Sequence, residues 1–328
     1  MLDFLSRVDR SKNSKFRYYL NSYLSLGAPD WLHKQMLDCA PVNAANQMAI
    51  TDRVNYYHRW SRPFSLGENA VSLSQFRQHA KKTYFFDLYR YIRLFPKARF
   101  CYKFGDVRDI PECPTFVKSR PIVETNHPSI LLNLNKIRHF IHVDDVTPTA
   151  HKKDLLVWRG AAYQEHRKQF MQSYIDHPRC NIGQTNHCDN RAWMKERMTI
   201  AEQLQYKFIL SLEGNDVASN LKWIMSSNSL AVMPKPKFET WFMEGRLQGG
   251  EHYVEIKDDY SDLEKQMDYY LSHPKEAAEI VANAKHYVAQ FQNEALENTI
   301  AITVVSRYLN LSSCFGESNI FLDDWQYT

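Results

Sequence analysis

The chain has 328 residues and a mass of 38.7 kDa, which is room for two domains that each bury a core. Hydrophobic residues make up 44% of the chain and charged residues 24%, which excludes a mainly disordered protein, and ten glycines exclude a collagen-like one. Lys and Arg total 41 against 37 Asp and Glu, so the net charge is only +4. We therefore expect no nucleic-acid partner, because proteins of that class carry a stronger or more clustered basic excess.

The first residues, MLDFLSRVDRSKNSKFRYYL, lack the continuous apolar stretch of a signal peptide, and no window is apolar enough for a transmembrane helix. The six cysteines are spread widely, so we expect reduced thiols and a cytoplasmic protein. Residues 2–26 mix Arg and Lys with Phe, Tyr and Leu. This mixture suits peripheral contact with the cytoplasmic face of the inner membrane, but the sequence favours a surface helix that covers a core.

The first half of the chain is rich in aromatic residues. In residues 84–97 (YFFDLYRYIRLFPK), Phe85, Leu88, Ile92 and Phe95 have helical spacing, which predicts a helix with these side chains in a core. Further along we predict a strand over residues 98–104, a strand over 115–123, a helix over 129–140 and the start of a strand over 139–143.

The second half alternates between apolar runs and amphipathic stretches. The predicted strands are 155–158, 206–212, 229–233 and 253–256, and the predicted helices are 161–174, 217–226, 258–274 and 274–291. This alternation predicts an α/β fold with a mostly parallel sheet and helices on both faces. Ligands of such folds lie beyond the carboxyl ends of the strands.

A polar connector over residues 144–153 marks the predicted domain boundary. We therefore expect an N-terminal domain over residues 1–150, a second domain over 151–308 and a tail over 309–328 that packs back across them. The acidic pairs at 144–145 and 258–259 are typical of solvated turns.

Three strand ends in the second half are candidate ligand sites. After the first, Arg159 and Gly160 are followed by Arg167; glycine permits close backbone approach and arginine suits phosphate oxygens. After the second, Gly214 leads into a predicted helix whose N-terminus could hold a diphosphate. An ordinary capped turn explains this second element equally well. After the third, Glu239 could hold a ribose, or could be a solvated surface acid.

The sequence GDVRDIP at residues 105–111 places two carboxylates and an arginine in one strand-end turn. A carboxylate there could accept a proton from an attacking hydroxyl, and the adjacent arginine would keep it ionised. A purely structural turn remains the alternative. His177, Cys180, His187 and Cys188 are close in sequence, but their spacing differs from that of structural zinc sites, so we expect no metal.

The stretches GDVRDIPECPTFVKSRPI, VWRGAAYQEHR, YKFILSLEGNDVASNLKWIMSSNSLAVM, KPKFETWFMEG and HYVEIKDDYSDL together resemble glycosyltransferase family 90, over roughly residues 80–295. The resemblance is greatest to the bacterial lipopolysaccharide-modifying branch. It implies the GT-B arrangement, in which two Rossmann-like domains face a cleft, and inverting transfer from a UDP-sugar.

The resemblance also implies roles for individual residues. Asp109 matches the catalytic base of the family, and Arg167 matches its diphosphate contact. The remaining nucleotide-sugar contacts that it implies are Arg159, Gly160, Gly214, Asn215, Ser219, Asn220, Lys222 and Glu239. Animal members carry an arginine in place of Asn220, so Lys222 is a candidate for the second phosphate contact.

The combined prediction is a metal-independent enzyme without a cofactor. It would move a hexose or pentose from a UDP-sugar to a hydroxyl of a lipopolysaccharide core or another oligosaccharide. Two other function classes stay open: a non-catalytic carbohydrate-binding scaffold on the same fold, and a different nucleotide-sugar enzyme such as a protein O-glycosyltransferase. The sequence leaves the sugar, the acceptor and the oligomeric state undetermined.

Overall fold

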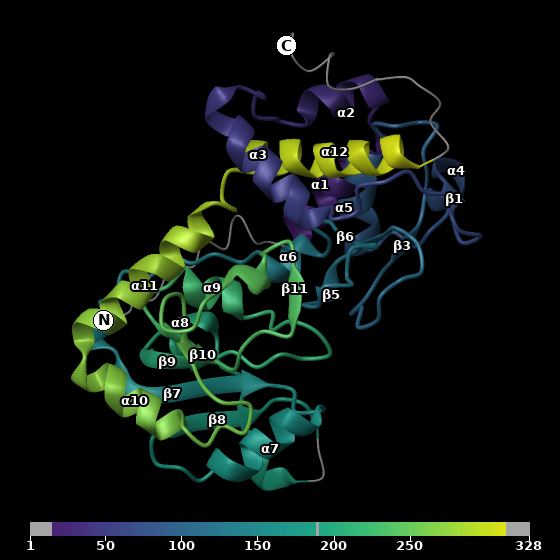
Figure 1. Cartoon of the computed structure of the whole chain (residues 1–328). Helices are drawn as coiled ribbons and strands as arrows, with labels where there is room; N and C mark the ends of the chain where they lie inside the picture. The colour runs from purple at the N-terminus through teal and green to yellow at the C-terminus, as the bar shows by residue number, and fades with distance from the viewer. Residues whose placement is uncertain (1–14, 188–189, 313–328) are drawn as a thin grey trace. The chain divides into compact units, whose positions relative to one another are not determined.

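The computed structural model describes residues 15–187 and 190–312, and within them the chain forms two compact units (Figure 1). The N-terminal unit comprises Lys15–Arg138, Lys237–Gly245 and residues 291–312. The central unit comprises His139–Pro236 and Arg246–Gln290. Each unit is described by itself below.

The central unit contains a five-stranded, wholly parallel sheet. Its strands are β7 (Lys153–Gly160), β8 (Cys180–Gln184), β9 (Tyr206–Leu210), β10 (Leu230–Met233) and β12 (Val254–Glu255). They lie in the order β12-β10-β9-β7-β8, so that β7 pairs with both β8 and β9. The expectation of an α/β chain with a parallel sheet is confirmed.

Three of the described helices connect strands of this sheet: α7 (Glu165–Tyr174), α8 (Ile200–Gln203) and α9 (Leu221–Met225). Helices α10 (Leu263–Ser272) and α11 (Pro274–Ala289) follow β12. Alternate strand residues such as Trp158, Phe208 and Val232 share one buried cluster with side chains from α7, α10 and α11. The intervening residues Val157 and Ile209 are also fully buried. Burial of both sheet faces explains why the strands are continuous apolar runs in the sequence.

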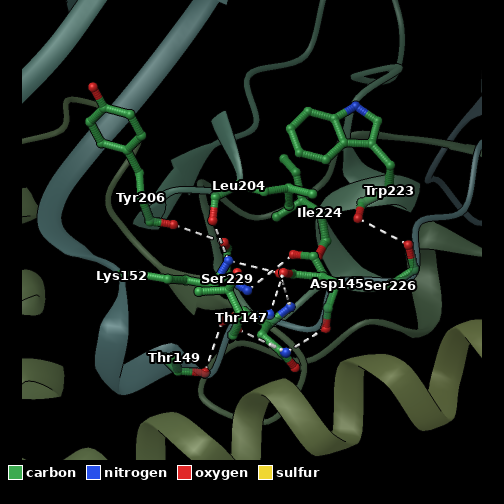
Figure 2. A network of polar contacts seen from close by, with 12 residues as sticks. Asp145, Thr147, Thr149, Lys152, Leu204, Tyr206, Trp223, Ile224, Ser226 and Ser229 are labelled. Carbon is green, nitrogen blue, oxygen red and sulfur yellow. Dashed lines mark hydrogen bonds and ion pairs between the residues drawn. The ribbon is translucent and has the colours of Figure 1, made fainter. Parts of the chain in front are cut away.

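The connector that precedes β7 is held by buried polar contacts, which Figure 2 shows. The Asp145 carboxylate accepts hydrogen bonds from Lys152 Nζ at 2.7 Å and from the backbone N–H of Asn228 at 2.8 Å. The Thr149 hydroxyl donates to the carbonyl of Asn228 at 2.9 Å. The side chains of Asp145 and Lys152 are 4% and 0% exposed, so the interpretation of residues 144–145 as a solvated turn was wrong for Asp145.

The N-terminal unit has shorter strands in three small sheets. They are β1 (Val71–Ser72), β2 (Arg99–Phe100), β3 (Tyr102–Lys103), β4 (Thr115–Val117), β5 (Ser119–Pro121), β6 (Ser129–Leu131) and β11 (Phe238–Thr240). Strands β3, β4 and β6 form a parallel sheet, whereas β1–β2 and β5–β11 are antiparallel pairs.

Helices of the N-terminal unit contribute many of its buried side chains. They are α1 (Lys15–Gly27), α2 (Asp30–Met36), α3 (Ala44–Tyr57), α4 (Leu73–Phe76), α5 (Thr83–Ile92), α6 (Lys136–His139) and α12 (Glu294–Leu311). In α5 the predicted helical face is confirmed, since Phe85, Leu88 and Ile92 are fully buried. The long helix α12 joins this core, and its Glu297 carboxylate pairs with the buried Arg53 of α3.

Two predictions for the first half were wrong. Residues 129–140 do not form one helix: β6 occupies the start, and α6 begins only at Lys136. Asn135, with φ of 58°, separates the two elements, because a left-handed residue interrupts a continuous helix. The predicted start of a strand at 139–143 is absent, since His139 is helical and residues 140–143 form no regular element.

The compact units also group the chain differently from the predicted division at residue 150. Lys237–Gly245 and residues 291–312 belong with the N-terminal unit, because β11 pairs with β5 and α12 packs on α3 and α5. Most of the predicted tail, residues 313–328, lies outside the described residues. None of the described helices is long and apolar enough to cross a membrane.

Candidate functional site at the ends of β7 and β9

The strand order of the central unit marks one place where a ligand would bind. If the five strands are numbered from 1 to 5 along the chain, they lie in the order 2-1-3-4-5. The connection from β7 leads to β8 on one side, and the connection from β9 leads to β10 on the other. Such adjacent strands define the topological switch point of an open parallel sheet, and ligands bind beyond the carboxyl ends of the strands there.

Arg167 of α7 lies at this switch point. Its Nη1 donates to the carbonyl of Ala161, just after β7, at 2.8 Å. Its Nη2 and Nε donate to the carbonyls of Leu212 and Glu213, just after β9, at 2.6 and 2.8 Å. One half-buried guanidinium therefore joins the two strand ends and fixes a positive charge between them.

Trp158 and Gly160 shape the site beneath Arg167. The guanidinium carbon of Arg167 lies 5.7 Å from the centre of the Trp158 ring, within the range of a cation–π contact. A Cβ added to Gly160 would lie 2.5 Å from Cζ2 of the same ring. Since Trp158 is buried, only glycine fits at this position without displacing the ring.

The loop after β9 carries the second predicted group of residues. Asn215 Oδ1 accepts a hydrogen bond from Gln164 Nε2 at 3.0 Å, which links this loop to the start of α7. Asn220 donates from Nδ2 to the Leu210 carbonyl at 3.0 Å. The structure thus brings Gly214, Asn215, Ser219 and Asn220 to the same edge of the sheet as Arg167.

The helix that was expected at Gly214 begins later. Helix α9 has only five residues and starts at Leu221, so no helix N-terminus lies at Gly214. Lys222, the candidate second phosphate contact, is fully buried within α9. The loop itself, and not a helix end, therefore forms this part of the site.

Two residues at this edge were not singled out from the sequence. Gln164 is the N-cap residue of α7, and Nε2 of His166 lies 2.8 Å from the Glu213 carbonyl. Both lie within the helix predicted over residues 161–174, and a helical pattern does not show which side chains point back across the sheet edge.

Arg159 is directed to a different place. Its guanidinium donates to the carbonyls of Asn181 and Glu196 at 2.8 and 3.0 Å, and to Asn181 Oδ1 at 2.9 Å. These contacts tie β7 to β8, on the side of β7 away from β9. The two arginines that the sequence placed together thus bind different neighbours.

Glu239 belongs to the N-terminal unit and has no exposed surface. One carboxylate oxygen accepts from Arg120 Nε at 2.6 Å, and the other accepts from the hydroxyl of Tyr56. Glu239 is therefore not a solvated surface acid, because both carboxylate oxygens have partners within the N-terminal unit.

Asp109 lies on the surface of the N-terminal unit, with its side chain 64% exposed. Lys103 Nζ is 2.7 and 2.6 Å from its two oxygens, and these hydrogen bonds hold the pKa of Asp109 below its ordinary value. The cation that keeps Asp109 ionised is therefore Lys103, whereas the sequence had suggested the adjacent arginine. Such a carboxylate can accept a proton at neutral pH.

Two contacts hold the start of the turn that carries Asp109. Lys118, whose side chain is almost fully buried, pairs with Asp106 at 2.7 Å, and the N–H of Val107 donates to the Ser119 hydroxyl at 3.3 Å. Gly105 starts the turn with φ of 100°, a conformation that favours glycine.

The described residues considered for zinc are not gathered into one group. His177 Nε2 lies 3.2 Å from a carboxylate oxygen of Glu264, and Cys180 is a buried free thiol; Cys188 lies outside the described residues. Across residues 15–187 and 190–312, no three His, Cys, Asp or Glu side chains are grouped so that they could hold a metal ion.

Comparison with known proteins gives the class of this molecule. The model of glycosyl transferase family 90 matches residues 131–310, a range that contains the whole five-stranded sheet. The O-glucosyltransferase LpsA of Dichelobacter nodosus is 44% identical over 307 residues, covering 90% of this chain and 96% of that protein. The protein is therefore a glycosyltransferase. It belongs to glycosyl transferase family 90, as the sequence resemblance indicated.

Proposed function

We propose that the protein transfers glucose from UDP-glucose to a hydroxyl of a lipopolysaccharide core or a related surface glycan, with inversion at the anomeric carbon. The similar protein is named as an O-glucosyltransferase, which favours glucose among the sugars that the sequence left open. The observation that carries the proposal is Arg167, whose guanidinium joins the ends of β7 and β9.

The donor diphosphate would bind at this switch point of the central unit. Arg167 supplies a fixed positive charge, and Gly214, where an added Cβ would lie 3.5 Å from Arg167 Nη2, leaves room for close approach of phosphate oxygens. Gly160 contributes by allowing the Trp158 ring to pack beneath Arg167. We place Asn215, Ser219 and Asn220 around the same donor. We assign Arg159 and Lys222 to positioning the sheet and α9, and Glu239 to the core of the N-terminal unit.

Asp109 would act as the base, with the two units arranged as in GT-B enzymes. The acceptor hydroxyl gives its proton to the Asp109 carboxylate while its oxygen forms a bond to the anomeric carbon of the sugar. The bond from that carbon to the UDP oxygen breaks, and UDP leaves with the electron pair. Attack opposite the leaving group inverts the anomeric centre.

We further propose that transfer needs no metal ion. Negative charge develops on the departing diphosphate, and a preorganised guanidinium such as that of Arg167 can stabilise it. The free thiols of Cys39, Cys101, Cys113 and Cys180 agree with a reducing compartment, so we extend the proposal to action in the cytoplasm.

The donor site is tested by calorimetric titration of UDP, with Mg²⁺ and with EDTA. Arg167→Ala should weaken UDP binding by roughly 10- to 100-fold, since a charge-assisted hydrogen-bonding group is lost. Arg159→Ala is the matched control and should leave the affinity unchanged. Absence of UDP binding in the wild-type protein would contradict the UDP-sugar assignment and favour a donor that carries another nucleotide.

The base is tested separately with Asp109→Asn, which is nearly isosteric. It should abolish glucose transfer while UDP affinity stays within about twofold, because the carboxylate acts on the acceptor proton. Wild-type turnover in this variant would refute the assignment. Screening core oligosaccharides against serine-containing peptides as acceptors would distinguish a glycan-modifying enzyme from a protein O-glycosyltransferase.

A further inference from the structure

Two cysteines of the N-terminal unit meet at one edge of its parallel sheet. Cys101 directly precedes β3, and Cys113 lies just before β4, 12 positions further along the chain. Because β3 and β4 are neighbouring parallel strands, their amino ends lie at the same edge. The two Sγ atoms are 3.8 Å apart, which is direct contact, and both thiols are free.

The backbone on either side of this contact is held by Tyr308 of α12. Its hydroxyl accepts a hydrogen bond from the N–H of Cys101 at 3.0 Å and donates one to the carbonyl of Pro114 at 3.0 Å. The N–H of Phe116 adds a hydrogen bond to the carbonyl of Cys101 at 2.9 Å. These contacts hold the two chain segments together, so the approach of the sulfur atoms does not depend on a weak S–H hydrogen bond.

The two thiols differ in access and in acidity. Cys113 is half-buried, whereas Cys101 is 3% exposed. Burial, together with the neighbouring Cys113, raises the pKa of Cys101 to about 11. Since a thiol reacts with an oxidant as the thiolate and only where the oxidant can reach it, Cys113 should react first. Cys101 is then placed to attack the oxidised Cys113.

The turn that carries Asp109 lies between the two cysteines. Residues 111–114, which lead from this turn to β4, form neither helix nor strand. A disulfide needs a sulfur–sulfur distance of about 2.0 Å, and this irregular segment can adjust as Cys113 moves toward Cys101. A covalent bond between them would tie the end of the turn to the residue before β3.

We propose that Cys101 and Cys113 form a reversible disulfide in the presence of hydrogen peroxide. The Cys113 thiolate attacks a peroxide oxygen, the O–O bond breaks, and a sulfenic acid and hydroxide result. The Cys101 thiolate then attacks Sγ of Cys113, and the S–S bond forms as the S–O bond breaks and a second hydroxide leaves. The two thiol protons convert both hydroxides to water. Both sulfur atoms are oxidised and one peroxide is reduced.

Thiol–disulfide exchange with a dithiol reductant would restore both thiols. Disulfides of cytoplasmic proteins are mostly transient in this way, so the pair agrees with the compartment proposed above. The reaction needs neither a sugar donor nor an acceptor. It therefore does not depend on the proposed function or on the role of Asp109.

Peptide mapping of the full chain by mass spectrometry tests the bond. Trypsin separates residues 100–103, which contain Cys101, from residues 109–118, which contain Cys113. After a small excess of hydrogen peroxide, these peptides should appear linked, with a mass two hydrogen atoms below their sum, and dithiothreitol should separate them. Linkage of Cys113 to another cysteine, or its conversion to sulfinic acid without a linked product, would overturn the proposal.

Two variants test the order of the steps. Cys101→Ser should accumulate a sulfenic acid on Cys113 that dimedone captures, because the second thiol is absent. In Cys113→Ser, Cys101 should be oxidised at least about tenfold more slowly than Cys113 is in Cys101→Ser. Equal rates would contradict the assigned order.

Cys39→Ser is the matched control, because Cys39 is also a half-buried free thiol and lies between α2 and α3. It should give the linked peptides at the wild-type rate, and a lower yield of them would contradict a bond confined to Cys101 and Cys113. The wild-type map decides the proposal by itself if a serine variant folds poorly.

Discussion

Arg120 and Glu239 face each other in register across the antiparallel strands β5 and β11, although 119 residues separate them in sequence. Arg120 Nε lies 2.6 Å from Glu239 Oε1, and neither side chain has exposed surface. The Nη1 and Nη2 atoms of Arg120 donate to the carbonyls of Ser129 and Tyr56. This pair therefore joins β11 to the first half of the chain within the N-terminal unit.

Replacing Glu239 should destabilise the N-terminal unit. Glu239→Gln would leave Arg120 as a buried charge without its counter-ion, and we expect the free energy of unfolding to fall by about 3 to 5 kcal/mol. Denaturant unfolding measures this change. Glu165→Gln, which removes an exposed ion pair with Lys168, is the control and should cost under about 0.5 kcal/mol. Weaker UDP binding with unchanged stability would instead indicate the ribose contact predicted from the sequence.

Substitution by alanine should destabilise the protein at one strand-end glycine, Gly160, and not at the other, Gly214. Gly160→Ala places a Cβ against the buried ring of Trp158 and should lower the free energy of unfolding by about 1 to 3 kcal/mol, with a change in tryptophan fluorescence. Gly214→Ala is the control, since its Cβ would lie 3.5 Å from Arg167 Nη2, an ordinary contact distance. Equal stability of the two variants would refute the packing argument.

The pH dependence of transfer should depend on Lys103. Asp109 works as a base only when ionised, and Lys103 lowers its pKa. Turnover is therefore lost as the pH falls through this lowered pKa. Lys103→Met raises the pKa, so the acidic limb of the pH–rate profile should move to higher pH, whereas Lys103→Arg should keep its position. A limb that does not move in Lys103→Met would show that Lys103 does not control the base.

The buried pair of Asp145 and Lys152 should be strongly coupled. Each single alanine variant leaves one charge buried without its partner, and we expect a loss of about 3 to 5 kcal/mol in the free energy of unfolding. The double variant should cost less than the sum of the two. Thermal or denaturant unfolding of all four proteins gives the coupling energy. Additive losses would mean that the two side chains contribute independently.

The sequence predicted the central unit better than the N-terminal unit. Apolar runs such as residues 229–233 form strands buried on both faces, and such runs are visible without knowledge of the fold. In residues 129–140 the same apolar spacing suited a helix, but the start pairs with β4. Pairing between distant segments overrode the local pattern there, and a local pattern cannot reveal its partner.

For the candidate site, the sequence singled out Arg167, Gly160 and the turn of Asp109, because strand ends and glycines mark where ligands approach an α/β sheet; their roles stay a prediction. The directions of the side chains were decided only by the tertiary structure. It directs Arg159 to β8 and Arg167 to β9, and it buries Glu239 against Arg120. Periodicity determines which residues share a face of an element, whereas packing against distant segments determines what that face meets.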